Sequence, residues 1–265
     1  MVIRRLTEKS GLGWLVISTT VLVGAAFLFF SDVGTFGPSR LANAQSKMPQ
    51  DEFERRIRAY LLDHPEVIAE ALQRLEERER AAQASAAMSV LKTRADEVLR
   101  DPDSPVGGNP EGDVTLVEFF DYNCPYCRQV APYMAKAEAN DPKLRIVYKE
   151  FPILGASSSH AAKAALAANR QGKYAAFHRA LMESKGTLTE SGVLEVAGRI
   201  GLDLARLKAD MADRTIQVAI DRNLALARAL NINGTPGFVV GEQIAPGAID
   251  LATMERLIRD ARGKK

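Results

Sequence analysis

The sequence has few residues of the kinds that build metal sites and no large excess of basic charge. It contains two cysteines, three histidines and one tryptophan in 265 residues, and its net charge is only +2. A structural zinc site takes about four ligands, and there is no second cysteine pair to supply them. The absence of a basic patch argues against a nucleic-acid partner. Apolar residues at 46% and charged residues at 26% are instead typical of a globular protein with a packed core.

The first 44 residues contain a long apolar run. A basic flank precedes it, and no charged residue occurs from Ser10 to Ser31. Such a run predicts either a signal peptide or an N-terminal membrane anchor formed by residues about 11–30. Small residues around Ala44 are typical of a cleavage site, so removal near that residue and retention as an anchor both stay open. Either alternative exports the remainder of the chain.

Residues 45–100 have the apolar periodicity of helices. Phe53, Ile57 and Tyr60 recur at spacings of three and four. A long helix is then predicted from about Pro65 to Leu99. Its second half follows a heptad-like spacing at Ala84, Met88, Leu91, Ala95 and Val98. The helix either packs on its own domain or acts as an oligomerisation arm, and its half-polar surface favours the arm.

Residues 101–113 are dense in proline, glycine and aspartate, which marks a domain boundary. β-Branched and aromatic residues then predict buried strands over 114–122 and 144–153. A block at about 157–230 is helical by pattern, and two short strands and a last helix follow it. This order predicts an α/β domain over 101–265 with an inserted helical subdomain.

Both cysteines lie in the segment FFDYNCPYCRQV, where the first strand gives way to a helix. Cys124 falls at the helix start, where unpaired amide groups and the helix dipole stabilise a thiolate, the attacking species in disulfide exchange. Cys127 lies one turn further in and can resolve a mixed disulfide on Cys124. Pro125 fits the first turn, and Tyr126 offers an apolar face beside the sulfurs. The pair predicts a redox centre that needs no cofactor.

Two other interpretations of the pair are weaker. Zinc lacks further ligands, because the three histidines are scattered along the chain. A purely structural disulfide would close a very small loop, and cross-links of small loops stabilise a fold least.

A second motif, NGTPGF at 233–238, lies more than a hundred residues downstream. A proline that follows a turn and enters a strand is a natural place for a cis bond. A cis Thr235–Pro236 bond would turn backbone polar groups outward beside the sulfurs, where an extended substrate could pair with them. An ordinary trans proline at a strand start is the alternative.

With these motifs, the sequence resembles the DsbA-like thiol:disulfide oxidoreductases of the bacterial envelope, which have a thioredoxin fold with a helical insertion. The resemblance covers about residues 101–265. The stretch DEFERRIRAYLLDHPEVIAEALQRLEERE further resembles the helical extension of the ScsC-type branch, which is linked to copper tolerance. Members with this extension can form trimers and act as disulfide isomerases or reductases.

The resemblance implies roles for individual residues. Cys124 matches the attacking cysteine and Cys127 the resolving one. Pro236 matches a cis-proline and Thr235 the residue before it. Glu118 matches an acidic residue buried behind the active site, where a raised pKa would allow it to pass protons during exchange. A strand residue that points at solvent is the alternative for Glu118.

Two positions at which this sequence differs from the strongest oxidant of the family bear on the direction of electron flow. The pair Pro125-Tyr126 replaces the Pro-His of the strongest oxidant of the family, so a less oxidising site is expected. Thr235 also appears in isomerase-type members. We therefore expect a disulfide isomerase or reductase, with a dithiol oxidase as the alternative. A chaperone or metal-binding module of the envelope is an alternative of another class.

The resemblance also implies partners and a location. We expect unfolded or misoxidised envelope proteins as substrates, a membrane thiol/disulfide partner, and a homo-oligomer, for which a trimer is one option. The expected location is the periplasm of a Gram-negative bacterium, soluble after cleavage near Ala44 or anchored to the inner membrane by residues about 11–30.

Overall fold

The structure, a computed structural model, describes residues 48–263. The segments expected to form the leader, residues 1–44, lie outside the described residues. The chain divides into two compact units, residues 1–58 and 59–265, and the second contains the strands and both cysteines.

Within residues 48–263, three helices precede the first strand: α1 (Gln50–Asp63), α2 (Glu66–Thr93) and α3 (Ala95–Leu99). The prediction of one unbroken helix from Pro65 to Leu99 is therefore wrong at Arg94, where φ is −117°. Past the break, the backbone carbonyl of Glu97 accepts a hydrogen bond of 2.8 Å from Nζ of Lys149 in the sheet, a contact that the pattern of the helix does not encode.

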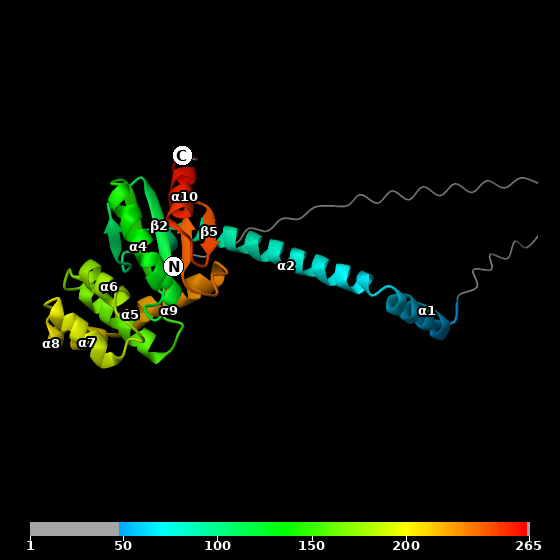
Figure 1. The fold of residues 1–265 in the computed structure, drawn as a ribbon, viewed down its shortest axis with the longest axis horizontal. Helices are drawn as coiled ribbons and strands as arrows, with labels where there is room; N and C mark the ends of the chain where they lie inside the picture. The colour runs from blue at the N-terminus through cyan, green and yellow to red at the C-terminus, as the bar shows by residue number, and fades with distance from the viewer. Residues whose placement is uncertain (1–47, 264–265) are drawn as a thin grey trace, which may run out of the picture. The chain divides into compact units, whose positions relative to one another are not determined.

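The second unit contains a five-stranded sheet in the order β1-β3-β2-β4-β5 (Figure 1). Its strands are β1 (Val106–Gly108), β2 (Val114–Phe120), β3 (Leu144–Glu150), β4 (Gly237–Val240) and β5 (Gln243–Pro246). The central strands β2 and β3 are parallel, and every other pair is antiparallel. The predicted strands in 114–122 and 144–153 are confirmed.

β1 was not expected, because the segment that contains it has the composition of a linker. It forms an edge strand paired with β3. A Cβ atom at Gly107 would lie 2.9 Å from the ring of Tyr148, so only glycine allows this close approach. Gly107 therefore allows the strand to form, although a glycine at this position also makes the sequence of the segment resemble that of a turn.

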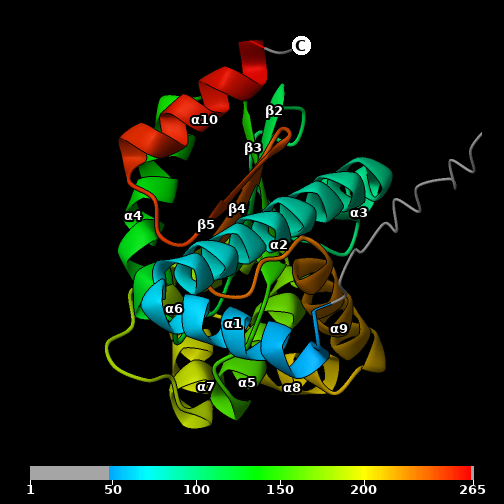
Figure 2. The same cartoon turned by 90° about the vertical axis from the view of Figure 1, so that its right-hand side faces the viewer.

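Alternate residues of β2 face opposite sides of the sheet. Leu116 and Phe120 belong to a core cluster that includes residues of α4 (Pro125–Asn140) and α10 (Leu251–Gly263). Val117 and Phe119 belong to a second cluster that includes Leu91 of α2. Figure 2 shows α4 and α10 together on one side of the strands, with α9 on the other.

Five helices separate β3 from β4 and form the helical subdomain. They are α5 (Ala156–Asn169), α6 (Tyr174–Met182), α7 (Glu190–Arg199), α8 (Leu204–Met211) and α9 (Arg214–Ala229). Figure 1 shows α5 to α8 gathered as one group beside the sheet. The predicted order of strand, helix, strand, helical block, two strands and last helix is confirmed.

A buried ion pair joins the segment that precedes β1 to strand β3. Nζ of Lys149 lies 2.8 Å from Oδ2 of Asp101, and the two side chains are 0% and 8% exposed. Arg222 of α9 approaches the other oxygen of Asp101 at 3.1 Å. The segment assigned to a boundary by its composition is therefore anchored through a charge in the core.

Candidate active site

Cys124 occupies the N-cap position of α4, with an extended backbone at φ −77° and ψ 118°. Its amide donates a hydrogen bond of 3.0 Å to the carbonyl of Asp121, which closes the turn after β2. Pro125 follows at the first helical position, where its missing N–H removes no hydrogen bond. The sulfur is therefore held beside the unpaired amide groups of the first turn, as the sequence suggests.

The NGTPGF segment contacts the cysteine motif at the sulfur of Cys124. The Cys124 thiol lies 3.2 Å from the backbone oxygen of Thr235, to which it can donate a hydrogen bond. The Thr235–Pro236 bond is cis, and Pro236 itself is buried. The carbonyl of Pro236 accepts a hydrogen bond of 2.9 Å from Gly247, so the loop before β4 is fixed against the loop after β5.

Cys127 lies one helical turn beyond Cys124 and is completely buried. Burial, followed by the negative charge of Glu118, raises the pKa of the Cys127 thiol. Both cysteines are free thiols in the structure. Ionisation is thus penalised at Cys127, so a nearby group must take its proton when it attacks.

Glu118 is the charged group beside Cys127. It lies on β2 facing the same side as Leu116 and Phe120, and its side chain is 1% exposed. Burial raises the pKa of the Glu118 carboxyl to about 8. Its Oε1 atom is buried and has no hydrogen-bond partner among the described residues. The solvent-facing alternative for this residue is therefore wrong.

Tyr126, between the cysteines, is 61% exposed. Its ring is available to a substrate but contributes little to the core. Pro125 is exposed as well.

Two residues that the sequence analysis did not select join the cysteine turn to the helical subdomain. Nδ2 of Asn123 donates to the hydroxyls of Ser157 and Ser158, each at 3.1 Å, and its Oδ1 accepts from Leu188 at 2.8 Å. Both residues lie beside the cysteines in sequence, and each has a partner in the helical subdomain 34 or more positions away.

The second of these residues is Arg128, one turn beyond Cys124. Its Nε donates to the carbonyl of Tyr122 at 2.8 Å, and its Nη1 donates to the carbonyl of Gly186 in the loop between α6 and α7. With Asn123 it holds the turn on both sides of the attacking sulfur.

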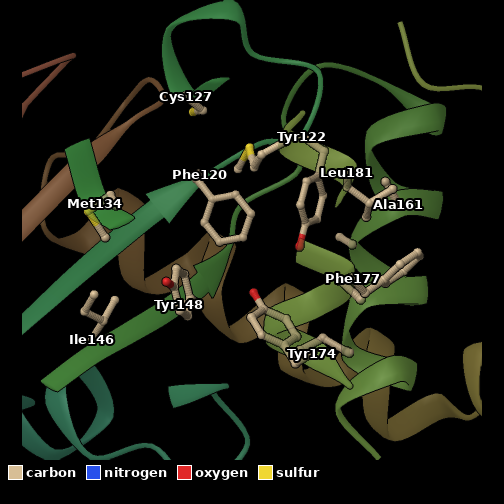
Figure 3. Close-up of a cluster of buried hydrophobic side chains, with 14 of the residues drawn as sticks. Phe120, Tyr122, Cys127, Met134, Ile146, Tyr148, Ala161, Tyr174, Phe177 and Leu181 are labelled. Carbon is tan, nitrogen blue, oxygen red and sulfur yellow. The ribbon is translucent and has the colours of Figure 1, made fainter. Parts of the chain in front are cut away.

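Tyr122 and Tyr174, two of the buried side chains in Figure 3, belong to a buried polar network. The hydroxyls of Tyr122 and Tyr174 donate to Oε1 of Glu150 at 3.2 and 2.9 Å. Nδ1 of His178 lies 3.1 Å from the Tyr122 hydroxyl, and burial lowers the pKa of this histidine to about 3. Burial also raises the pKa of Glu150. Burial thus disfavours the charged forms of both His178 and Glu150 in this network.

Within residues 48–263, no three histidine, cysteine, aspartate or glutamate side chains are grouped so that they could hold a metal ion.

Comparison with known proteins identifies both parts of the chain. Residues 115–259 match the family described as DSBA-like thioredoxin domain, and residues 50–82 match the copper resistance protein ScsC N-terminal domain. These matches confirm the predicted thioredoxin fold with a helical N-terminal region.

Solved structures agree with these matches. A thioredoxin-like oxidoreductase from Silicibacter pomeroyi DSS-3 is 48% identical, with a TM-score of 0.62 over 63% of this chain and 97% of that one. A linker-deletion mutant of Proteus mirabilis ScsC is 27% identical, with a TM-score of 0.64 over 86% of this chain and 100% of that one. The chain thus has the architecture of a thiol:disulfide oxidoreductase of the DsbA and ScsC type.

Some curated relatives are named as antiporters rather than as thiol:disulfide oxidoreductases. The Na⁺/H⁺ antiporter NhaA 1 of Salinispora arenicola is 32% identical over 164 residues, which cover 61% of this chain. The matched region spans 25% of that antiporter's length. The domain therefore also occurs as part of longer proteins named for a different activity.

These relatives contradict the expected location. A periplasmic protein was predicted, soluble after cleavage near Ala44 or anchored through residues 11–30, whereas antiporters such as NhaA 1 are membrane proteins. The periplasmic assignment is accordingly withdrawn. Both features on which it relied lie outside the described residues. In residues 48–263, every helix is too short or too polar to cross a bilayer.

Proposed function

Because this chain belongs to the family of DSBA-like thioredoxin domains, we propose that Cys124 and Cys127 form its redox-active pair and act on disulfides of other proteins. The observation that carries this proposal is the position of Cys124, at the N-cap of α4 and 3.2 Å from the carbonyl of Thr235. A thiolate at this position lies at the positive end of the helix, where negative charge is stabilised.

The exchange proceeds in two steps in the reducing direction. The Cys124 thiolate attacks one sulfur of a substrate disulfide, forms a mixed disulfide, and releases the other substrate sulfur as a thiolate. Cys127 then loses its proton and attacks the Cys124 sulfur. This second step forms the Cys124–Cys127 disulfide and releases the remaining substrate thiolate. The substrate gains two electrons and the cysteine pair loses them.

Isomerisation uses the first step alone. The substrate thiolate released by Cys124 attacks another disulfide of the same substrate, and a substrate thiolate finally displaces Cys124. No net electrons are transferred, and Cys127 provides an escape from complexes that do not rearrange.

We assign Glu118 as the group that exchanges a proton with Cys127. Its negative charge acts on that thiol, and its pKa of about 8 lets it gain or lose a proton near neutral pH. The unpartnered Oε1 leaves one carboxyl oxygen available for the transfer. Glu118 is thus a positioned acid–base group behind the resolving cysteine.

We favour isomerase or reductase activity over dithiol oxidation because of the helical extension. Apolar side chains remain exposed on α1 and α2 at heptad-like spacings: Phe53, Ile57, Tyr60, Ile68, Leu72 and Leu75. Exposed apolar stripes of this kind mark contacts with another chain, and we propose a second copy of this one. Several Cys124 sites in one oligomer would attack a bound misfolded chain repeatedly. A trimer is one option for the number of copies.

The test is refolding of scrambled ribonuclease by the reduced full-length protein. We expect recovery of ribonuclease activity well above that with glutathione alone, and loss of that gain in Cys124→Ser. Recovery no better than glutathione would remove the isomerase proposal. Rapid oxidation of a reduced dithiol peptide by the oxidised protein, without isomerase activity, would instead favour the oxidase.

The same variant separates a catalyst from a chaperone. A binding module without redox chemistry would keep its effect on substrate aggregation after Cys124→Ser and would show no thiol exchange in the wild-type protein. A redox catalyst loses exchange in that variant whether or not it still binds unfolded chains.

A further inference from the structure

A pocket of about 320 Å³ lies between α4, α6 and the β1–β3 edge of the sheet. Neither cysteine lines it. Its apolar surface comes from Ala131, Pro132, Met134, Tyr148 and Met182. A volume of this size suits a small molecule, and methionine side chains adapt to the shape of what they enclose. The side chains of Met134 and Tyr148 are among those labelled in Figure 3.

Two arginines line the pocket. Arg128 donates through Nε and Nη1 to backbone carbonyls and its Nη2 is buried, so its guanidinium is already committed to the fold. Arg179 of α6 is exposed and makes no side-chain hydrogen bond or ion pair within residues 48–263. Its charge acts on both His178 and Tyr148, which line the same pocket.

Two acidic residues also line the pocket, but neither forms an ion pair with Arg128 or Arg179 in the part of the chain that the structure describes. Oε1 of Glu138 accepts a hydrogen bond of 3.0 Å from the amide of Gly108, at the end of the pocket formed by β1. Glu183 is exposed just past the end of α6. The pocket therefore combines apolar side chains with the exposed guanidinium of Arg179.

We propose that this pocket binds a small molecule with an apolar, ring-sized body and one carboxylate. The body packs against Met134, Met182 and Tyr148. The carboxylate pairs with the exposed guanidinium of Arg179, in the planar geometry that guanidinium and carboxylate groups share.

The two methionines make the site observable in the full-length protein. The chain has seven methionines, so labelling their methyl groups with ¹³C gives a simple spectrum. Titration with 3-phenylpropanoate is expected to shift the Met134 and Met182 signals saturably and to leave those of Met88 and Met254 in place. Two comparison ligands separate the contribution of the ring to binding from that of the charge. 3-Phenylpropan-1-ol has the ring without the charge, and propanoate has the charge without the ring. Each should bind about tenfold more weakly or worse.

Arg179→Gln provides the matched variant, because Arg179 is exposed and holds no other part of the described fold. We expect it to weaken binding of 3-phenylpropanoate about tenfold. Arg199→Gln, an exposed arginine of α7 that does not line this pocket, should bind like the wild type. The proposal is overturned if both methionine signals stay fixed at millimolar ligand, if the alcohol binds as well as the acid, or if the two arginine variants bind equally.

Discussion

Oδ1 of Asn123 accepts a hydrogen bond of 2.8 Å from the amide of Leu188, which joins the residue before the attacking cysteine to the loop that precedes α7. The same side chain donates to two serine hydroxyls of α5. One amide group therefore connects the cysteine turn to two separate parts of the helical subdomain. The subdomain is not an independent appendage but a support for the position of Cys124.

Replacement of Asn123 by alanine should loosen this support. Three hydrogen bonds are lost and the amide of Leu188 is left without its acceptor, so the free energy of unfolding should fall by about 1–3 kcal/mol. Urea denaturation measures the change. Asn233→Ala is the control, because the Asn233 side chain bonds only to Asn231 and is exposed. Equal stability of the two variants would contradict the supporting role.

Replacement of Lys149 by methionine tests the buried ion pair with Asp101. Removal of one partner leaves the other charge in the core with less compensation, which should lower the free energy of unfolding by about 3 kcal/mol or more. The exposed Lys143→Met in the turn before β3 should change it by less than about 0.5 kcal/mol. A small effect at Lys149 would show that Arg222 alone is enough to compensate Asp101.

The buried carboxyl of Glu118 predicts a pH dependence of stability. Its folded pKa of about 8 lies above the ordinary value of 4.5, so the folded state retains a proton that the unfolded state loses. Its contribution to stability is complete below the unfolded pKa and is lost as pH rises through the folded pKa. Relative to wild type, Glu118→Gln should gain about 3 kcal/mol of unfolding free energy between pH values of about 5 and 8.

Denaturation curves across this pH range check the prediction. Glu195→Gln, at an exposed position of α7, should follow the wild-type curve. A parallel dependence in Glu118→Gln and wild type would mean that Glu118 is ionised at neutral pH and could not hold the proton that the proposed mechanism assigns to it.

Replacement of Leu72 by lysine tests the proposed contact between copies. Leu72 is 57% exposed on α2, so a lysine is tolerated by a single chain but places a charge in an apolar contact. Light scattering should show a lower mass for Leu72→Lys than for Gln73→Lys, which introduces the same charge at the next position. A wild-type mass equal to one chain, or an unchanged mass in Leu72→Lys, would contradict the proposal.

The parts of the fold that follow from local pattern were predictable. The strands β2 and β3 are rich in β-branched and aromatic residues, and the helix start at Cys124 and Pro125 is encoded by adjacent residues. β1 was missed because Gly107 serves a contact with Tyr148 rather than a local preference. The break at Arg94 was missed because no glycine or proline marks it, and the contact of Glu97 with Lys149 beyond it joins two distant elements.

The site divides in the same way. The two cysteines, Thr235 and Pro236 are recognisable from short motifs, whereas Asn123 and Arg128 join the helical subdomain through partners far along the chain. The local signal at Asn123 is its polar side chain between the aromatic segment FFDY and a cysteine. Without the fold, no pattern identifies the loop between α6 and α7 as the partner of these two side chains.

The most direct test traps the first step of exchange. Full-length Cys127→Ser is mixed with a peptide that contains a disulfide, and the products are separated without reductant and weighed by mass spectrometry. Since the chain has only two cysteines, any adduct of this variant must be on Cys124. The account predicts a long-lived mixed disulfide in Cys127→Ser and none in Cys124→Ser. No adduct in the first variant, or an equal adduct in the second, would contradict it.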